Sequence, residues 1–535
     1  MTEIRTPLFD SFDAFRRLDV AGVCKKNGLL YVPGDVLTRI AFEAFGDASF
    51  FLRATQLQTW RDILDDAESS PNDRFAALSF LKNACVSCKR VLPLCQDTGT
   101  ATVFGEKGHR VLTDGNDAEA LSAGIRQAYA QYNLRYSQNA ALSFFNEKNT
   151  GDNLPAAVEL AAVKGDEYRF LFVAKGGGSA NKTFLFQQTR ALLEKKALTA
   201  FLAEKIAQIG TSACPPYRLA VVVGGLSAEQ CLHAVKLACA GALDGLPAHG
   251  NENGDAFRDA DMEAVVKTVA NATGFGAQFG GKHFCSSVRC VRLPRHGASL
   301  PVGIGVSCAA DRNVLARVTK DGAFLERLEE RPERFLPDER TVSVFDGAKK
   351  IDLDGSAESA LKQLHGCAVG EKVLLSGTMT VARDQAHARF KAKIDAGEPL
   401  PDYVKKYPIY YAGPAKTPAG LPCGSLGPTT AGRMDDYTEV LQSVGASLIM
   451  VGKGMRSKKV AESCKKYGGF YLGALGGAAA LTTAAHITSC TCIDYADLGM
   501  EAVYRLHVEN FPAVVLIDDA GHDFYDTVLK SKRPF

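Results

Sequence analysis

A cysteine stands beside a carboxylate in the stretch VLPLCQDTGTATVFGEKG, residues 91–108. An apolar run leads directly into Cys95, and Gln96 and Asp97 follow it. A thiol that only packs in a core needs no polar neighbours, whereas a thiolate that binds a soft metal can stand next to groups that handle a substrate. The stretch therefore predicts a metal ligand at Cys95 and a working carboxylate at Asp97.

Two further cysteines precede this stretch, in the order C-x2-C-x6-C. Cys85 and Cys88 could belong to a zinc or iron–sulfur knuckle. No second C-x2-C follows along the chain, however, and the periodicity of SFLKNACVSC is helical. We therefore favour helix packing over metal binding for this pair.

The glycine-rich segment AKGGGSANKT, residues 174–183, follows an apolar run. A nucleotide-binding phosphate loop requires glycine before Lys-Ser/Thr, but Asn181 precedes Lys182 here, which argues against nucleotide binding. Two interpretations remain open. The backbone N–H groups of the glycines could face an anionic ligand, or the segment could be an ordinary tight turn.

Four cationic residues lie in loops or at predicted helix starts: Arg135, Arg383, Arg433 and Lys453. Guanidinium groups bind carboxylates through two parallel hydrogen bonds, so a cluster of them would suit a small polycarboxylate. His296, in the loop RLPRHGASLP, is a candidate for acid–base catalysis, although a single loop histidine more often has a structural role.

Apolar runs that end in glycine turns must position these residues. Several lead into helical patterns, and Ser227 with Gln230 forms the pattern of a capping box before one of them. This alternation predicts an α/β fold. The charged, proline-containing stretch 325–341 predicts the end of one domain and a linker. The clearest strand-like runs are 170–178, 219–225, 447–454 and 513–521.

The composition limits the classes of function. The chain has 535 residues, 46% of them hydrophobic, which is enough for at least two domains. Lys and Arg number 62 against 60 Asp and Glu, and this balance argues against a nucleic-acid or membrane surface. No apolar run is long enough to span a membrane. The start of the chain lacks the features of a signal or transit peptide, so we expect a cytoplasmic rather than a mitochondrial protein, whose 15 cysteines suit metal binding or catalysis better than disulfides.

Six longer motifs follow one another along the chain: PLCQDTGTA, AKGGGSANKT, CSSVRCVRLPRHGASLPVGI, GPTTAGRMDDY, VGKGM and the final ALGGAAALTTAAHI…VLIDDAGHDFY. In this order they resemble the class I, iron–sulfur-dependent fumarate hydratases in their single-chain form. The resemblance covers the chain from about residue 40 to the end. The L-tartrate dehydratases share this scaffold as two subunits, whereas both parts lie on one chain here.

The resemblance implies a [4Fe–4S] cluster bound by Cys95, Cys214 and Cys308, with one iron left open as a Lewis acid. The implied reaction is the reversible hydration of fumarate to (S)-malate. Thr429 matches the base that takes the carbon-bound proton, with Arg383 or Asp97 as its activating neighbour. Asp97 would be the acid that handles the departing oxygen, with His296 near it. The implied contacts with the dicarboxylate are Gln96, Asp97, Arg135, Gly178, Arg383, Thr429, Arg433 and Lys453.

The resemblance also implies how the chain is divided. A large N-terminal α/β domain (1–329) carries the cluster, a linker follows (330–345), and a smaller C-terminal α/β domain of swivelling type (346–535) clamps the substrate when the domains close. A homodimer is implied, and no nucleic-acid or membrane partner is expected. Two alternatives remain: a hydro-lyase for L-tartrate or mesaconate, and an iron–sulfur sensor without catalysis.

Overall fold

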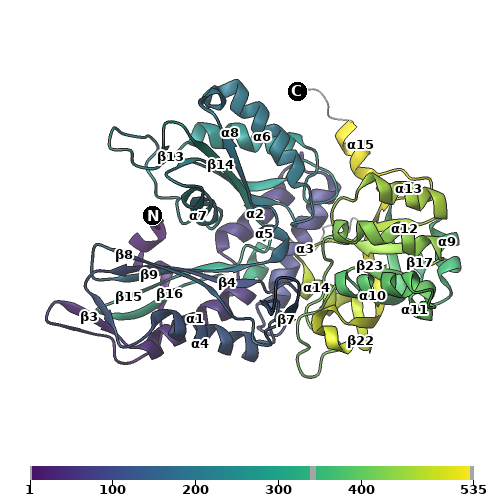
Figure 1. The fold of residues 1–535 in the computed structure, drawn as a ribbon, viewed down its shortest axis with the longest axis horizontal. Coiled ribbons are helices and arrows are strands. Elements are labelled where there is room, and N and C mark those ends of the chain that lie inside the picture. Colours follow the sequence, from purple (N-terminus) through teal and green to yellow (C-terminus); the bar gives the residue numbers. More distant parts are fainter. Residues whose placement is uncertain (1–2, 338–344, 531–535) are drawn as a thin grey trace.

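The computed structural model describes residues 3–337 and 345–530 (Figure 1). Its strands form three main sheets, two from residues before 338 and one from residues after 344. Within these ranges, no strand pairing joins the first two sheets to the third. Figure 1 shows the C-terminal part, in green and yellow, as a separate body packed against one side of the rest. The predicted α/β fold is confirmed.

The first sheet has six strands in the order β1-β16-β15-β9-β4-β8. Helices α1 (Gly34–Phe50) and α4 (Asp117–Gln131) cover one of its faces (Figure 1). There the rings of Phe45 and Phe172 meet edge-on, with their centroids 5.9 Å apart. The predicted strand at 170–178 is β9, central and largely buried. The strands are β1 (Phe15–Arg17), β16 (Gly322–Glu326), β15 (Asn313–Thr319), β9 (Tyr168–Lys175), β4 (Thr100–Gly108) and β8 (Ala157–Val163).

The second sheet has five strands in the order β10-β14-β11-β13-β12. Helix α7 (Ala228–Cys239) lies between the two sheets, while α6 (Lys195–Ile209) and α8 (Ala260–Ala272) cover the outer face (Figure 1). The Ser227 side chain accepts a hydrogen bond from the Gln230 backbone N–H, which confirms the predicted start of α7. The strands are β10 (Phe184–Gln188), β14 (Leu300–Ser307), β11 (Tyr217–Gly225), β13 (Cys285–Arg295) and β12 (Phe257–Arg258).

Helices α2 (Ala54–Asp65) and α3 (Pro71–Ser87) pack beside these layers. Ser70 and Asp73 form a reciprocal capping box at the start of α3. Cys85 lies in the last turn of α3 and Cys88 directly follows it, so the helical interpretation of this pair is confirmed. The smaller elements are β2 (Cys24–Lys26), β3 (Leu29–Val32), β5 (Val111–Thr113), β6 (Asn139–Ala141), β7 (Glu147–Asn149), α5 (Gly177–Ala180), η1 (Pro7–Asp10), η2 (Phe12–Ala14), η3 (Arg190–Leu193) and η4 (Pro332–Phe335).

The C-terminal sheet has seven strands in the order β17-β18-β19-β20-β21-β23-β22. The long strand β23 also pairs with β18, which closes five of the strands into a ring. The strands are β17 (Lys349–Asp352), β18 (Lys372–Val381), β19 (Ile409–Tyr410), β20 (Ile449–Gly452), β21 (Phe470–Gly473), β22 (Ile487–Asp494) and β23 (Val503–Ile517). The helices are α9 (Ala357–Leu364), α10 (Asp384–Asp395), α11 (Asp402–Lys406), η5 (Ala431–Met434), α12 (Asp435–Ser443), α13 (Lys458–Tyr467), α14 (Ala479–His486), η6 (Ala496–Glu501) and α15 (Phe524–Lys530).

The two parts of the chain pack through helix α14 of the C-terminal part and helix α3 of the N-terminal part. Strand pairing in the N-terminal part ends with β16 and resumes at β17 in the C-terminal part. Of the predicted linker, residues 338–344 lie outside the described residues, and the boundaries 1–329 and 346–535 stay a prediction. In the described part of the chain, every helix is too short or too polar to cross a bilayer.

Candidate active site

Strand register brings Cys214 and Cys308 together, although 94 residues separate them. Cys214 precedes β11 and Cys308 follows β14. These two strands are antiparallel neighbours in which Arg218 is paired with Ser307, so the two cysteines lie at the same end of the sheet. The backbone N–H of Ala309 donates to the carbonyl oxygen of Cys214 at 2.9 Å and ties the two loops together.

Cys95 is held in place by its neighbours on both sides of the domain junction. The Leu94 backbone N–H donates to the Ser49 carbonyl at 3.0 Å, and the Asn83 side chain donates to the Leu94 carbonyl at 3.0 Å. From the C-terminal part, Ser425 Oγ donates to the Pro93 carbonyl at 2.6 Å. The loop that carries the predicted ligand is therefore fixed by α1, α3 and the second domain.

The three predicted ligands are free thiols in a largely buried position. Burial raises the pKa of Cys308 to about 12, and the Cys214 and Cys95 thiols add to this effect. Burial also raises the pKa of Cys214, against the lowering effect of Lys453. In the absence of a metal these thiols keep their protons, and they lose them when a metal binds. The site is therefore suited to holding a soft metal.

A lysine from the C-terminal domain reaches the thiol of Cys214. Lys453 directly follows β20, and its Nζ donates to Cys214 Sγ at 2.8 Å. Burial lowers the pKa of Lys453, but the neighbouring Cys214 and Cys95 outweigh this and raise it above its usual range. The predicted cation at position 453 therefore remains charged in a buried place beside the thiols. Gly178 also lies here, since a Cβ on it would be 3.8 Å from Lys453 Nζ.

Asp97 is fixed as a carboxylate. Its Oδ2 accepts a hydrogen bond from the Gly177 backbone N–H at 2.8 Å, and its Oδ1 lies 3.0 Å from Arg135 Nη2. Burial alone would raise the pKa of Asp97, but Arg135, Arg312 and the Gly177 N–H lower it to about 2. The glycine segment at 174–183 therefore uses one of its N–H groups to hold an anionic side chain, and Asp97 is ionised at neutral pH.

Thr429 is hydrogen-bonded by an arginine on the next turn. Arg433 Nη2 donates to Thr429 Oγ1, while the same guanidinium lies 3.1 Å from Asp384. The family resemblance predicts Arg383 or Asp97 as the activating neighbour, but in the described part of the chain the hydrogen-bond partner of Thr429 Oγ1 is Arg433. Arg383 instead pairs with Glu501 at 2.9 Å. A guanidinium that donates to a hydroxyl oxygen favours the deprotonated form of that hydroxyl.

Two contacts join the Asp97 loop to the C-terminal domain. Gln96 Nε2 donates to the Pro428 carbonyl, next to Thr429, at 3.2 Å. Arg135 Nη1 donates to the Gly413 carbonyl at 3.2 Å. The structure thus brings together, across the domain junction, all the predicted site residues except one: Cys95, Cys214, Cys308, Gln96, Asp97, Arg135, Gly178, Arg383, Thr429, Arg433 and Lys453.

Within one chain, His296 lies far from the other predicted site residues. It occupies the exposed turn between β13 and β14, and its ring accepts from the Ala298 backbone N–H at 3.2 Å. Because Arg295 pairs with Gly225, at the far end of β11 from Cys214, the length of a strand separates His296 from the three cysteines. The eight steps from Tyr217 to Gly225 along β11 correspond to roughly 25 Å.

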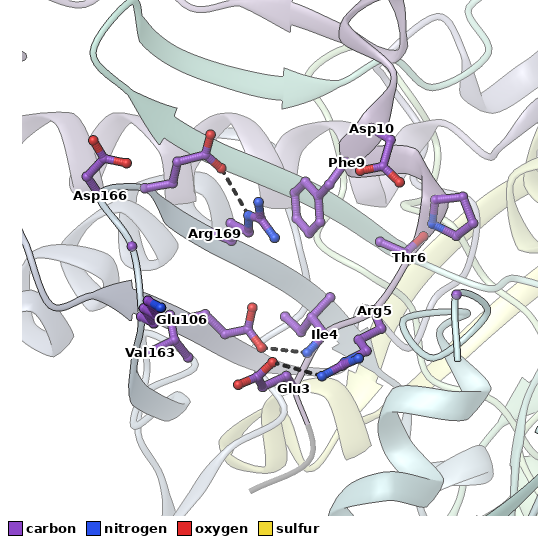
Figure 2. Close-up of a pocket in the computed structure, with 15 residues that line it drawn as sticks. Glu3, Ile4, Arg5, Thr6, Phe9, Asp10, Glu106, Val163, Asp166 and Arg169 are labelled. Atoms are coloured by element: carbon purple, nitrogen blue, oxygen red, sulfur yellow. Dashed lines mark hydrogen bonds and ion pairs between the residues drawn. The ribbon is translucent and has the colours of Figure 1, made fainter. Parts of the chain in front are cut away.

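Two hollows in the surface differ in their relation to these residues. One of about 580 Å³ is lined from both domains, by Arg135 on one side and Gln385, Met500 and Glu501 on the other, and so borders the Asp97–Arg135 pair. Another of about 660 Å³ lies under the N-terminal segment (Figure 2). Its Glu106 carboxylate accepts from the Ile4 N–H at 2.5 Å, and it contains none of the predicted site residues.

Arg312 is a residue of this site that the sequence analysis missed. It is 3% exposed, and its Nε and Nη1 are buried without a hydrogen-bond partner among the described residues. A signal was present in the sequence, since Arg312 stands four residues after Cys308 in SCAADRN. A single arginine in a loop is more often a surface charge, and the sequence does not show that this one is buried.

The residues fit an iron–sulfur cluster better than a single ion. Within residues 3–337 and 345–530, no three His, Cys, Asp or Glu side chains converge closely enough to hold one metal ion. A cluster has its own extent, so its thiolate ligands need not converge on one point. Two buried thiols, the half-buried thiol of Cys308 and the unpartnered donors of Arg312 could supply the ligands and the hydrogen bonds that such a cluster requires.

Comparison with known proteins identifies the family. Sequence models described as "Fumarate hydratase (Fumerase)" and "Fumarase C-terminus" match residues 38–317 and 322–528. Fumarate hydratase 2 of Leishmania major is 52% identical over 500 residues, which are 94% of this chain and 88% of that protein. The anaerobic class I fumarate hydratase of Escherichia coli (strain K12) is 52% identical over 504 residues, 94% of this chain and 92% of that protein. The putative L(+)-tartrate dehydratase subunit beta of Methanocaldococcus jannaschii is 37% identical over 168 residues, 30% of this chain and 85% of that protein. The chain therefore belongs to the class I fumarate hydratase family and is a hydro-lyase.

Proposed function

We propose that this protein catalyses the reversible hydration of fumarate to (S)-malate with a [4Fe–4S] cluster held by Cys95, Cys214 and Cys308. The observation that carries the proposal is the meeting of three free thiols, two buried and one half-buried, from segments far apart in the sequence, beside the Asp97–Arg135 ion pair. When bound, the cluster would supply a Lewis acid at an iron without a protein ligand.

The cationic side chains would hold the two carboxylates of the substrate. Arg135 comes from the N-terminal domain, and Arg383, Arg433 and Lys453 come from the C-terminal domain. Arg383 and Arg433 are already oriented by Glu501 and Asp384, so little side-chain freedom would be lost on binding. Because these side chains come from both domains, the substrate would be enclosed only when the two domains pack together.

Asp97 and Thr429 would handle the two protons. In the hydration direction, the Asp97 carboxylate accepts a proton from the water that adds to one carbon, and a proton is delivered to the other carbon from Thr429. In the reverse direction, deprotonated Thr429 Oγ takes the carbon-bound proton, and Asp97, protonated in that form of the enzyme, returns a proton to the departing hydroxyl. Between turnovers, solvent takes the proton from one of these two side chains and returns one to the other. The hydrogen bond from Arg433 stabilises deprotonated Thr429, which takes the carbon-bound proton. The ion pair with Arg135 favours the ionised form of Asp97, which accepts the proton of water.

A role for His296 depends on the proposed homodimer. The exposed turn that carries His296 lies far from Asp97 within one chain, so only the partner subunit's His296 could take part in the acid–base step. A test is to mix two inactive variants, His296→Asn and Asp97→Asn, under conditions where subunits exchange. Recovery of turnover in the mixture supports a shared site, while an inactive mixture with exchanged subunits would show that the partner's His296 does not complete it. A His296→Asn variant that is active by itself would remove His296 from the mechanism.

The proposal is tested by reconstituting the cluster without oxygen and measuring turnover on fumarate, mesaconate and L-tartrate. We expect fumarate to be the preferred substrate. Preference for L-tartrate is the second candidate, supported by the match between the C-terminal part and a tartrate dehydratase subunit. Reconstituted protein that binds the cluster but turns over none of the three would instead favour an iron–sulfur sensor.

A further inference from the structure

Arg312 occupies a buried position between two strands that frame the site. It directly precedes β15 and follows the Cys308 loop. Its backbone carbonyl accepts a hydrogen bond from the Ala174 N–H at 2.9 Å, which fixes the main chain. The side chain extends into the protein, since the residue is only 3% exposed.

The guanidinium of Arg312 has unused donors. Nε and Nη1 are fully buried, and among residues 3–337 and 345–530 neither has a hydrogen-bond partner. Buried donors without partners are rare in native proteins because water no longer compensates them. An arginine keeps its charge in such a place only where an anion or a strong acceptor stabilises it.

Acceptors for these two donors could come from the side of Arg312 that faces Cys95 and Cys308. Burial acts to lower the pKa of Arg312, but Cys95 and Cys308, followed by Asp97, outweigh it and raise the pKa. Asp97 itself pairs with Arg135, and its Oδ2 and Arg312 Nη2 both lie near the position that a Cβ on Gly176 would take, at 3.3 and 3.2 Å. The largest charge interactions of Arg312 are thus with two of the three proposed cluster ligands, and Arg312 lines one small cavity together with Cys308.

Arg312 and Lys453 stand at different ligands. Lys453 donates to Cys214, whereas the largest charge interactions of Arg312 are with Cys95 and Cys308. Together they provide a buried cation for each of the three thiolates. Lys453 already donates a hydrogen bond to the sulfur of Cys214. Two donors of Arg312, Nε and Nη1, have no hydrogen-bond partner among the described residues.

We propose that Arg312 is a positioning residue for the iron–sulfur cluster, whose Nε–H and Nη1–H donate to cluster sulfurs on the side of Cys95 and Cys308. The inference rests on the cluster assigned in the proposed function. Hydrogen bonds to the sulfurs stabilise the more reduced, more negative form of a cluster and hold it in place. Arg312 therefore raises the reduction potential and slows the loss of iron.

The test compares Arg312→Met and Arg312→Lys with wild type and with Arg317→Met. Arg317 is a matched control because it is equally buried, lies on β15 and donates to the Phe9 carbonyl instead of facing the cysteines. Each protein is reconstituted without oxygen, and iron, sulfide, the reduction potential and the electron paramagnetic resonance spectrum of the reduced cluster are measured. The rate at which the visible absorbance disappears in air gives the rate of cluster loss.

For Arg312→Met we expect cluster loss faster by roughly tenfold to hundredfold, as for a lost hydrogen bond to a charged acceptor, with a more negative potential and an altered spectrum. Arg312→Lys keeps the charge and so remains a foldable variant, but it should restore only part of the effect. Arg317→Met should behave like wild type. The inference is overturned if both Arg312 variants match wild type in potential, spectrum and rate of cluster loss. It is also overturned if Arg312→Lys alone matches wild type in all three. A wild-type protein that binds no cluster would instead refute the proposed function.

Discussion

A single methyl group at Gly476 tests how closely the C-terminal domain packs on the proposed cluster ligands. A Cβ at this position would lie 2.4 Å from Cys214 Sγ and 2.7 Å from Lys453 Cδ. Ordinary contacts between such atoms begin at about 3.5 Å, so the methyl group overlaps the thiol by about 1 Å. The backbone cannot move away easily, because Gln278 accepts from the Gly476 N–H and donates to its carbonyl, both at 2.9 Å.

We therefore expect Gly476→Ala to displace the Cys214 side chain and to break its contact with Lys453. Overpacking of this kind destabilises a protein by about 1–3 kcal/mol, and here the strain falls on a ligand. The measurements are the iron bound per chain after anaerobic reconstitution, turnover on fumarate, and unfolding of the metal-free protein in urea. Gly115→Ala is the control, since a Cβ there meets no atom within 4 Å. If Gly476→Ala binds as much iron and turns over as fast as the control, the packing of the second domain on Cys214 is not as described.

Three other predictions concern the protons, the charge of Asp97 and the metal. Thr429→Ala should keep the cluster's absorbance and lose turnover by roughly 10²–10⁴-fold, as for removal of an acid–base group, and unchanged turnover would exclude Thr429 as the base. Arg135→Gln removes the largest charge that lowers the pKa of Asp97 from its ordinary 3.8 to about 2, so this pKa should rise while Arg312 and the Gly177 N–H still hold it down in part. In the proposed mechanism the ionised form accepts the proton during hydration, so activity is lost as the pH falls through this pKa, and the acid limb of kcat/KM for fumarate should move to higher pH. An acid limb that stays in place would show that another group controls it. Iron removal by a chelator in air should abolish turnover, and iron with thiol under anaerobic conditions should restore it, whereas activity that persists after chelation would contradict a metal-dependent reaction.

The strands were largely predictable because their apolar runs are continuous. The runs at 170–178 and 219–225 correspond to β9 and β11, and the run at 447–454 contains β20. The run at 513–521 marks only the end of β23, which begins at Val503. The first half of β23 lies between β18 and β22 and carries polar residues on one face, so its sequence lacks an unbroken apolar run.

The site was less predictable, because its members meet through register and domain packing. Nothing in the spacing of Cys214 and Cys308 shows that they share one end of a sheet, and the family resemblance supplied both. The partner of Thr429 was missed since Arg433 is joined to it only by the 3-10 turn η5. Arg312 was missed because burial of a single loop arginine has no local signature in the sequence.

In the proposed function, three cysteines far apart in the sequence hold one cluster that the reaction requires. An anaerobic count of iron and sulfide, paired with a fumarate assay, tests it on wild type and on Cys95→Ser, Cys214→Ser and Cys308→Ser. We expect about four irons and four sulfides per wild-type chain, as in a [4Fe–4S] cluster, together with hydration of fumarate. Each variant should lose the cluster and the activity. Full iron content and turnover in any of the three variants would contradict it.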